Sequence, residues 1–330
     1  MNRFNRLNKW LYRGLFVGIS LVVTNNLANA SIYDRYGNKI PEQEAESENV
    51  NGELLSIAKD KTYNSIGVLY SYEGKCTVFL INPFPPSRLA PGKLGTTQPH
   101  FFNNSPAYAV TNGHCYNFRN FPGVDEVIVN QPSDLEVILN RFFDTKEEQI
   151  HSINVKKVAY ATMTTTDIAI LELDTTYAEL INRGFKPLMI APNPAGVGEY
   201  VELIGVPAIS KPFLHRTVCQ IGESVNLLED GYRWLGGIRH RCSAISGMSG
   251  SPVISLRTNQ VVAIHNTSVK DDALAQPECS VNRPCEVLAD GKIATFATEN
   301  YAQKVSDISS CFDEKGMFNL QLISCRLPKP

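Results

Sequence analysis

Short apolar runs recur along the chain from Thr62 onward, and residues typical of turns separate them. Runs of roughly four to eight residues bounded by Gly, Pro, Asn and Asp are typical of strands in all-β domains. We expect such strands at 65–71, 76–81, 107–111, 126–130, 135–139, 155–161 and 168–173, and again at 200–206, 216–224, 232–242, 252–256, 260–265 and 293–298. The two groups predict an all-β fold of two antiparallel β-barrels, at 61–190 and 191–310, linked by the Pro/Gly-rich segment 187–198.

Near the C-terminus the pattern changes to that of a helix. Thr298 is a suitable N-cap, and Tyr301, Val305 and Ile308 follow at i, i+4 and i+7 spacing, on one apolar face. We therefore expect a helix over 299–308. Residues 311–330 contain two cysteines and form an expected disulfide-containing extension, to which the sequence assigns no function.

The first thirty residues have the pattern of a secretory signal peptide. Basic residues precede a short apolar core at 15–23, and Ala28-Asn29-Ala30 fits a small-x-small cleavage site. The apolar core is too short to span a bilayer, so cleavage near Ala30 is favoured over an N-terminal anchor. We expect a secreted or periplasmic protein without stable membrane insertion.

Composition sets limits on partners and core size. A chain of 330 residues, 43 % of them hydrophobic, can bury a sizeable core. Its net charge of −2 does not indicate nucleic acid or an anionic membrane as a partner. Residues 31–60 are polar, with acidic residues over 42–48, so we expect either a propeptide or a mobile arm there.

Eight cysteines behind a signal peptide indicate an oxidising compartment and disulfide bonds. The chain has no Cys-x-x-Cys or His-x-x-x-His spacing, so we expect no metal, and nothing in the sequence suggests a cofactor. Eight cysteines allow about 105 pairings. Pairing of sequence neighbours would give Cys219–Cys242, Cys279–Cys285 and Cys311–Cys325.

Three short motifs carry the candidate chemistry. Ser249 lies in the sequence Gly247-Met248-Ser249-Gly250. A turn with these glycines can expose the serine hydroxyl and direct backbone N–H groups at one point. His114 follows an apolar run that ends at Thr-Asn-Gly-His-Cys, and Asp167 opens Asp-Ile-Ala-Ile-Leu. The chain order His, Asp, Ser is one of those on which a catalytic triad has been built.

These motifs resemble those of chymotrypsin-like serine proteases. Thr-Asn-Gly-His-Cys at 111–115 is similar to the family's Thr-Ala-Ala-His-Cys, and Asp-Ile-Ala-Ile-Leu at 167–171 to its Asp-Ile-Ala-Leu-Leu. Gly-Met-Ser-Gly-Ser-Pro at 247–252 resembles Gly-Asp-Ser-Gly-Gly-Pro, and is closer to the Gly-Asn-Ser-Gly-Ser-Pro of bacterial glutamyl endopeptidases. The resemblance covers residues 61–308 and implies two barrels with the active site between them and a C-terminal helix.

The resemblance also implies a function. A secreted serine endopeptidase would cleave protein or peptide substrates through an acyl-enzyme intermediate, and we expect it to be a monomer. Ser249 would be the nucleophile, His114 the base and Asp167 the residue that orients the imidazole. The N–H groups of Gly247 and Ser249 would form the oxyanion hole.

Two further features depend on the resemblance. It implies a disulfide between Cys115 and Cys76, next to the candidate base. It also places the Pro-rich insertion 83–106 near His114, where it would shape the side that binds substrate after the scissile bond. A surface elaboration without a role is the alternative for this insertion.

Activation and specificity are both expected to differ from those of trypsin. Met248 precedes the candidate nucleophile where trypsin-like zymogens have an aspartate, so it cannot pair with a new N-terminal ammonium group. Ser243 stands where trypsin-like enzymes have an aspartate at the base of the specificity pocket, which leaves no charge for Lys or Arg.

His265 suggests instead a pocket for glutamate. It ends Val-Val-Ala-Ile-His at 261–265, which resembles the Ile-Gly-Ile-His of glutamyl endopeptidases. With the hydroxyl of Ser246 it would bind the carboxylate of the residue before the cut, and an imidazolium would add charge. The alternatives are a structural histidine that closes a strand, and a pocket for small or apolar side chains.

A catalytically inactive member of the fold, acting as a binding or adhesion protein, is the alternative function. Inactive relatives usually lack a triad residue, whereas this chain contains all three.

Overall fold

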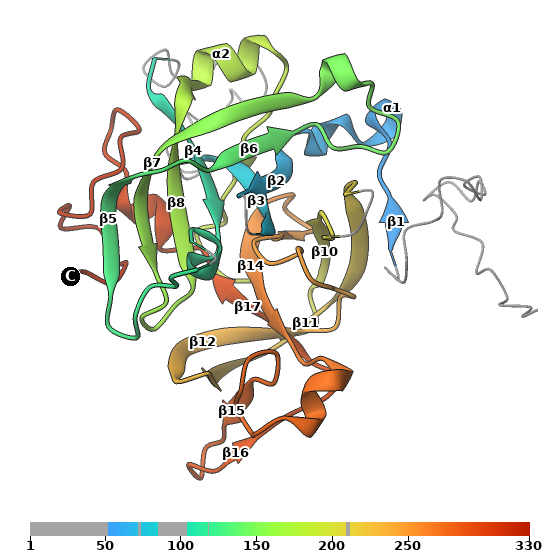
Figure 1. The fold of residues 1–330 in the computed structure, drawn as a ribbon, viewed down its shortest axis with the longest axis vertical. Helices are drawn as coiled ribbons and strands as arrows, with labels where there is room; N and C mark the ends of the chain where they lie inside the picture. The colour runs from blue at the N-terminus through green and yellow to red at the C-terminus, as the bar shows by residue number, and fades with distance from the viewer. Residues whose placement is uncertain (1–51, 72–73, 85–103, 118, 209–211) are drawn as a thin grey trace, which may run out of the picture. The chain divides into compact units, whose positions relative to one another are not determined.

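The computed structural model describes residues 52–71, 74–84, 104–117, 119–208 and 212–330 (Figure 1). The expected signal peptide, most of the expected arm and most of the 83–106 insertion lie outside the described residues. Strands dominate the described part, where no helix is long and apolar enough to cross a membrane.

The first set of strands closes into a ring, here called barrel 1. Its strands are β2 (Ile66–Tyr70), β3 (Lys75–Asn82), β4 (Pro106–Thr111), β6 (Glu136–Leu139), β7 (His151–Thr162) and β8 (Ile168–Thr176). They pair in the order β2-β6-β7-β8-β4-β3, and β3 pairs back with β2. Two further strands extend this sheet: β5 (Val127–Pro132) pairs with β7, and β9 (Leu188–Met189) runs parallel to β3.

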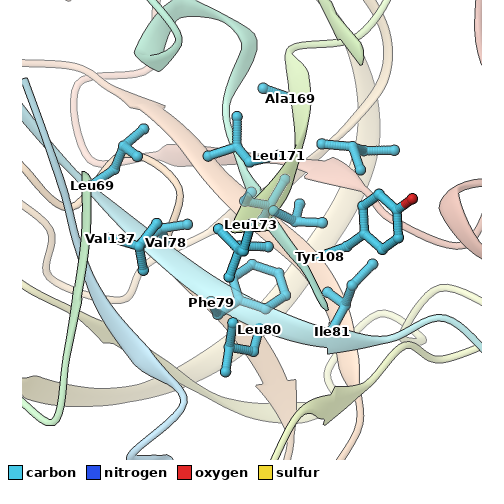
Figure 2. Close-up of a cluster of buried hydrophobic side chains, with 14 of the residues drawn as sticks. Leu69, Val78, Phe79, Leu80, Ile81, Tyr108, Val137, Ala169, Leu171 and Leu173 are labelled. Carbon is cyan, nitrogen blue, oxygen red and sulfur yellow. The ribbon is translucent and has the colours of Figure 1, made fainter. Parts of the chain in front are cut away.

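Apolar side chains from these strands fill barrel 1. Figure 2 shows Leu69, Val78 and Leu171, from β2, β3 and β8, close together in its interior. All three are fully buried. Since burial of one such side chain contributes about 1.5–3 kcal/mol, this interior holds the strands in register.

The second set of strands forms barrel 2. Its strands are β10 (Tyr200–Gly205), β11 (His215–Glu229), β12 (Tyr232–His240), β13 (Pro252–Ser255), β14 (Val261–Ser268) and β17 (Asn300–Lys304). They pair in the order β10-β13-β14-β17-β12-β11, and β11 pairs back with β10. Three short strands extend this sheet: β15 (Cys285–Val287), β16 (Ile293–Ala294) and β1 (Glu53–Leu54). The two barrels predicted from the apolar runs are thus confirmed.

Helices are few and short. The α-helices are α1 (Ile57–Asp60) and α2 (Tyr177–Asn182), and the 3₁₀ turns are η1 (Lys61–Tyr63), η3 (Gly113–Cys115), η4 (Glu147–Gln149), η5 (Asp271–Ala275) and η6 (Ile308–Cys311). A capping box between Thr176 and Glu179 begins α2.

The helix expected over 299–308 is wrong, because this segment contains β17. That strand pairs with both β12 and β14 and completes the ring of barrel 2. The pairing of backbone groups on two sides outweighs a weak helical periodicity. Only the η6 turn follows, and the strand expected at 293–298 is reduced to β16.

The last residues of the expected arm, 53–60, belong to the folded domain. Strand β1 pairs with β11, and Leu54 and Leu55 are buried. An ion pair between Glu53 and Arg216 joins the same two strands. Residues 53–60 are therefore part of the folded domain and not a mobile arm.

The C-terminal extension packs on barrel 1 (Figure 1). The rings of Phe312 and Phe318 lie 5.6 Å apart, and Phe312 contacts Tyr108 of β4 at 5.1 Å between ring centroids. Farther along, the carbonyl of Pro328 accepts a hydrogen bond from the Tyr160 hydroxyl at 3.1 Å. The extension thus covers apolar surface of the barrel, which accounts for its presence in structural terms.

All four expected disulfides are present, joining Cys76 to Cys115, Cys219 to Cys242, Cys279 to Cys285 and Cys311 to Cys325. The first connects β3 to the η3 turn that contains His114. It closes a loop of 39 residues.

Replacing Cys76 and Cys115 together by Ala should lower the free energy of unfolding by about 2–4 kcal/mol, because the unfolded chain regains the freedom of that loop. Denaturant titration of the double variant measures the loss. Replacing Cys279 and Cys285 in the same way is the control: its loop of 6 residues predicts a smaller loss. Equal losses from the two variants would contradict the prediction.

Candidate active site

Strand pairing brings His114 and Asp167 together. His114 lies just after β4 and Asp167 just before β8, and these two strands pair antiparallel with Thr111 opposite Ala169. The His114 backbone N–H donates to Asp167 Oδ1 at 3.0 Å, and its ring Nδ1 lies 2.7 Å from Oδ2. Both the backbone and the ring of His114 are therefore fixed by one carboxylate.

Asp167 is fully buried and receives a further donor from barrel 2. The side-chain amide of Asn266, in β14, donates to Asp167 Oδ2 at 3.1 Å. The Asn112 amide donates to the Asp167 carbonyl at 2.9 Å. Sequence analysis missed Asn266, whose only signal is its position directly after His265.

The electrostatics of this pair favour a charged imidazole. Burial lowers the pKa of His114, but the ion pair and the hydrogen bond with Asp167 outweigh it, so the pKa lies above its ordinary value of 6.5. The carboxylate therefore stabilises the protonated ring and makes the neutral ring a stronger base.

Ser249 lies in the serine loop, residues 246–250, which leads into β13. Gly247 and Gly250 have φ of +89° and +87°, a region that favours glycine. A Cβ on Gly250 would lie 2.1 Å from the carbonyl oxygen of Thr77, so this loop approaches β3 more closely than any side chain would allow. Met248 is fully buried within the apolar interior of barrel 2.

The backbone N–H groups of Gly247 and Ser249 are the expected oxyanion-hole donors. Within the described residues, neither N–H donates a hydrogen bond to another backbone group. The Ser249 hydroxyl donates to the carbonyl of Asn266 at 3.4 Å. An oxyanion hole requires donors without such partners close to the nucleophile.

A pocket of about 190 Å³ lies beside Ser249. His114 and Ser249 line it together, and an apolar wall includes Phe121, Tyr232 and Trp234. Both barrels contribute to this lining.

The structure brings two of the three expected specificity residues to this pocket. His265 and Ser246 line it beside Ser249. Ser243 is not among the described residues that line it, and its carbonyl accepts a hydrogen bond from the Thr217 hydroxyl at 3.2 Å.

His265 lies against a second buried histidine. Its Nδ1 is 3.1 Å from Nε2 of His240, and its Nε2 is 3.5 Å from the Ser268 hydroxyl. Burial lowers the pKa of His265 well below 6.5, and the nearby His240 and His114 lower it further. Burial also lowers the pKa of His240 to about 4. The expected imidazolium is therefore absent at neutral pH, and His265 offers a neutral ring.

Positive charge in the pocket comes from Lys270. Its ammonium group donates to the Ser246 hydroxyl at 2.9 Å, and both residues line the pocket together with Ser268. Sequence analysis missed Lys270 and Ser268, because neither belongs to a motif and both lie near the end of β14.

Two carboxyl groups line the pocket, those of Glu229 at the end of β11 and of Asp230, the next residue. Glu229 accepts hydrogen bonds from the Thr267 hydroxyl at 3.1 Å and from the Asn282 N–H at 2.7 Å, both at the same oxygen. Burial raises the pKa of Glu229 to about 7, although these hydrogen bonds act against it. Sequence analysis did not single out this residue.

Two clusters in the described part of the chain have the composition of metal sites: Cys76 with His114 and Cys115, and Cys219 with His240 and Cys242. In each cluster the two cysteines are joined in a disulfide. Metal-binding cysteines coordinate as thiolates, so neither cluster fits a metal while its disulfide is intact.

The chain was compared with curated proteins, solved structures and protein families. No curated protein matches the sequence. Among solved structures, a Glu endopeptidase in complex with MPD is 18% identical, covers 77% of this chain and 90% of its own, and has a TM-score of 0.45. An active-form protease of M. tuberculosis is 16% identical, with coverage of 82% and 85% and a TM-score of 0.45. Neuropsin, a serine protease of mouse brain, is 13% identical, with coverage of 78% and 94% and a TM-score of 0.46.

The match to a protein family is of a different kind, because it spans the motifs themselves. The trypsin-like peptidase domain matches residues 100–264, half of the chain, and this span contains His114, Asp167 and Ser249. The chain belongs to the trypsin-like peptidase domain family.

Proposed function

We propose that the protein is a serine endopeptidase that acts through a His114-Asp167-Ser249 triad. The observation that carries this proposal is the 2.7 Å contact between His114 and the buried Asp167, in a pocket that His114 shares with Ser249. A serine hydroxyl is a weak nucleophile until a base accepts its proton, and this contact orients and strengthens such a base.

The reaction would follow the order that these groups allow. Ser249 Oγ attacks the scissile carbonyl while its proton passes to His114 Nε2, and the carbonyl oxygen becomes an oxyanion bound by the N–H groups of Gly247 and Ser249. The protonated His114 then gives its proton to the leaving amine, which leaves an acyl-enzyme on Ser249. Water, deprotonated by His114, then attacks the acyl carbonyl. The acid product is released as the bond to Ser249 Oγ breaks and His114 returns the proton to that oxygen.

An inactive binding protein is the competing function. Such a protein would need neither the pairing of His114 with Asp167 nor free N–H groups beside Ser249. The four disulfides of the described part support a location in an oxidising compartment, secreted or periplasmic.

We further propose that the pocket accepts an acidic side chain before the cut. The Lys270 ammonium, the hydroxyls of Ser246 and Ser268, and the neutral ring of His265 converge on the pocket. Ammonium and hydroxyl donors together match a carboxylate, and the charge comes from Lys270 because His265 is neutral.

Replacing Ser249 by Ala should lower kcat for peptide hydrolysis by about 10⁶-fold and abolish labelling by a fluorophosphonate. Ser251→Ala, two residues away, is the matched control. It should retain both peptide hydrolysis and labelling by the fluorophosphonate. Mass mapping of the labelled peptide and a peptidase assay measure the effect. Full activity in Ser249→Ala, or label on Ser251, would disprove the role of Ser249.

The pH dependence should report His114. Since the imidazole must be neutral to act as a base, kcat/KM should fall as the pH drops through a pKa that lies above 6.5. Glu229, whose own pKa is about 7, is partly ionised in this range, and its charge contributes to raising the pKa of His114, so Glu229→Gln should move the acid limb to lower pH. Glu223→Gln, at an exposed position of the same strand, is the control and should not move it. A profile that is flat from pH 5 to 8 would contradict the prediction.

Replacing Lys270 by Met should lower kcat/KM for peptides with Glu before the cut by about 10- to 100-fold, since a charge-assisted hydrogen bond contributes about 1.5–3 kcal/mol. Peptides with Gln there should change little. Lys292→Met, at an exposed lysine paired with Asp290, is the control. Preferred cleavage after Leu, Phe or Arg by the unmodified protein would rule out the acidic pocket.

A further inference from the structure

The serine loop is held by four successive carbonyl groups that all accept hydrogen bonds. Ser246 O accepts from Ala208 N–H at 2.8 Å, and Met248 O accepts from Ser251 N–H at 3.0 Å. Gly247 O accepts from the Thr77 hydroxyl at 3.1 Å. Ser249 O accepts from the Thr77 N–H at 2.8 Å. Three of these donors are backbone groups, and one is a side chain that a mutation can remove.

Thr77 connects three segments at this point. It is fully buried in β3 of barrel 1. While its hydroxyl donates to Gly247 O in the serine loop, the same oxygen accepts from the Val206 N–H at 2.9 Å, just after β10. One hydroxyl therefore joins barrel 1 to the serine loop and to the segment that follows β10 in barrel 2.

The direction of these carbonyls decides the direction of the N–H groups. The two groups of a peptide unit point in opposite directions because the unit is planar and trans. The Ser246 and Met248 carbonyls belong to the peptide units that carry the N–H groups of Gly247 and Ser249. The Gly247 carbonyl lies between these two units, so its anchor limits rotation of both.

We propose that the Thr77 hydroxyl is a positioning element of the oxyanion hole, which holds the N–H groups of Gly247 and Ser249 in the orientation that binds the oxyanion. The proposal rests on the proposed peptidase function. Thr77 touches no substrate and acts through the serine loop. Because the oxyanion exists only in the transition state and intermediate, loss of this hydroxyl lowers kcat and leaves KM nearly unchanged.

The test compares Thr77→Val, which keeps the shape and removes the hydroxyl, with Thr77→Ser, which keeps the hydroxyl. Thr77→Val should lower kcat about 10- to 100-fold and change KM by no more than about threefold. This decrease in kcat should not exceed the decrease caused by removing an oxyanion-hole donor itself. Affinity for a peptide boronate, which forms a tetrahedral adduct, should fall in parallel. Thr77→Ser should restore both, and the acid limb of kcat/KM should stay in place in every variant.

Ser65→Ala is the matched control. Ser65 is a buried residue of barrel 1 whose hydroxyl also donates to a backbone carbonyl, that of Lys186, away from the pocket. It should retain kcat despite any loss of stability. If Thr77→Val does not fold, Thr77→Ala removes the same hydroxyl; if neither folds, the hydroxyl serves folding and the proposal is wrong.

Two outcomes separate this proposal from the proposed function. Hydrolysis that depends on Ser249, with an unchanged kcat in folded Thr77→Val, would overturn the role of Thr77 alone. A decrease in kcat that Ser65→Ala shares, or that Thr77→Ser does not restore, would overturn it as well. Absence of any hydrolysis that depends on Ser249 in the unmodified protein would overturn both.

Discussion

The docking of the serine loop on strand β3 is the constraint on which the rest of the site depends. The Thr77 N–H donates to the Ser249 carbonyl at 2.8 Å, and the closeness of Gly250 to β3 excludes any side chain there. The residue before Thr77 is Cys76, whose disulfide reaches Cys115 beside His114. Two neighbouring residues of β3 therefore hold the two parts of the site: Thr77 holds the serine loop, and Cys76 holds the turn that contains His114.

Two buried carboxyl groups near this point have different hydrogen-bond partners. Asp167 accepts from the backbone N–H of His114, from its ring and from the Asn266 amide. Glu229 accepts from two donors at one oxygen, while its other oxygen is buried and has no hydrogen-bond partner among the described residues. Hydrogen bonds to a carboxylate favour its charged form, and burial without them favours the neutral form. The pKa of Glu229 is accordingly raised to about 7.

Patterns within short stretches of sequence were sufficient to predict the strands and the motif residues. The apolar runs predicted both barrels, and the motifs around His114 and Ser249 marked two residues that line one pocket. Long-range features were not accessible. Strand β17 has a helical periodicity, and only its pairing with β12 and β14 shows why it is extended. Asn266 and Lys270 reach the site because β14 ends there, which no local motif encodes.

The central claim is that His114 and Ser249 act as one catalytic unit, and a double-mutant cycle on kcat tests it most directly. Residues that act in the same step give strongly non-additive losses. Ser249→Ala, His114→Ala and the double variant should have nearly the same residual kcat. Losses that multiply in the double variant, or a His114→Ala variant with the kcat of the unmodified protein, would contradict it.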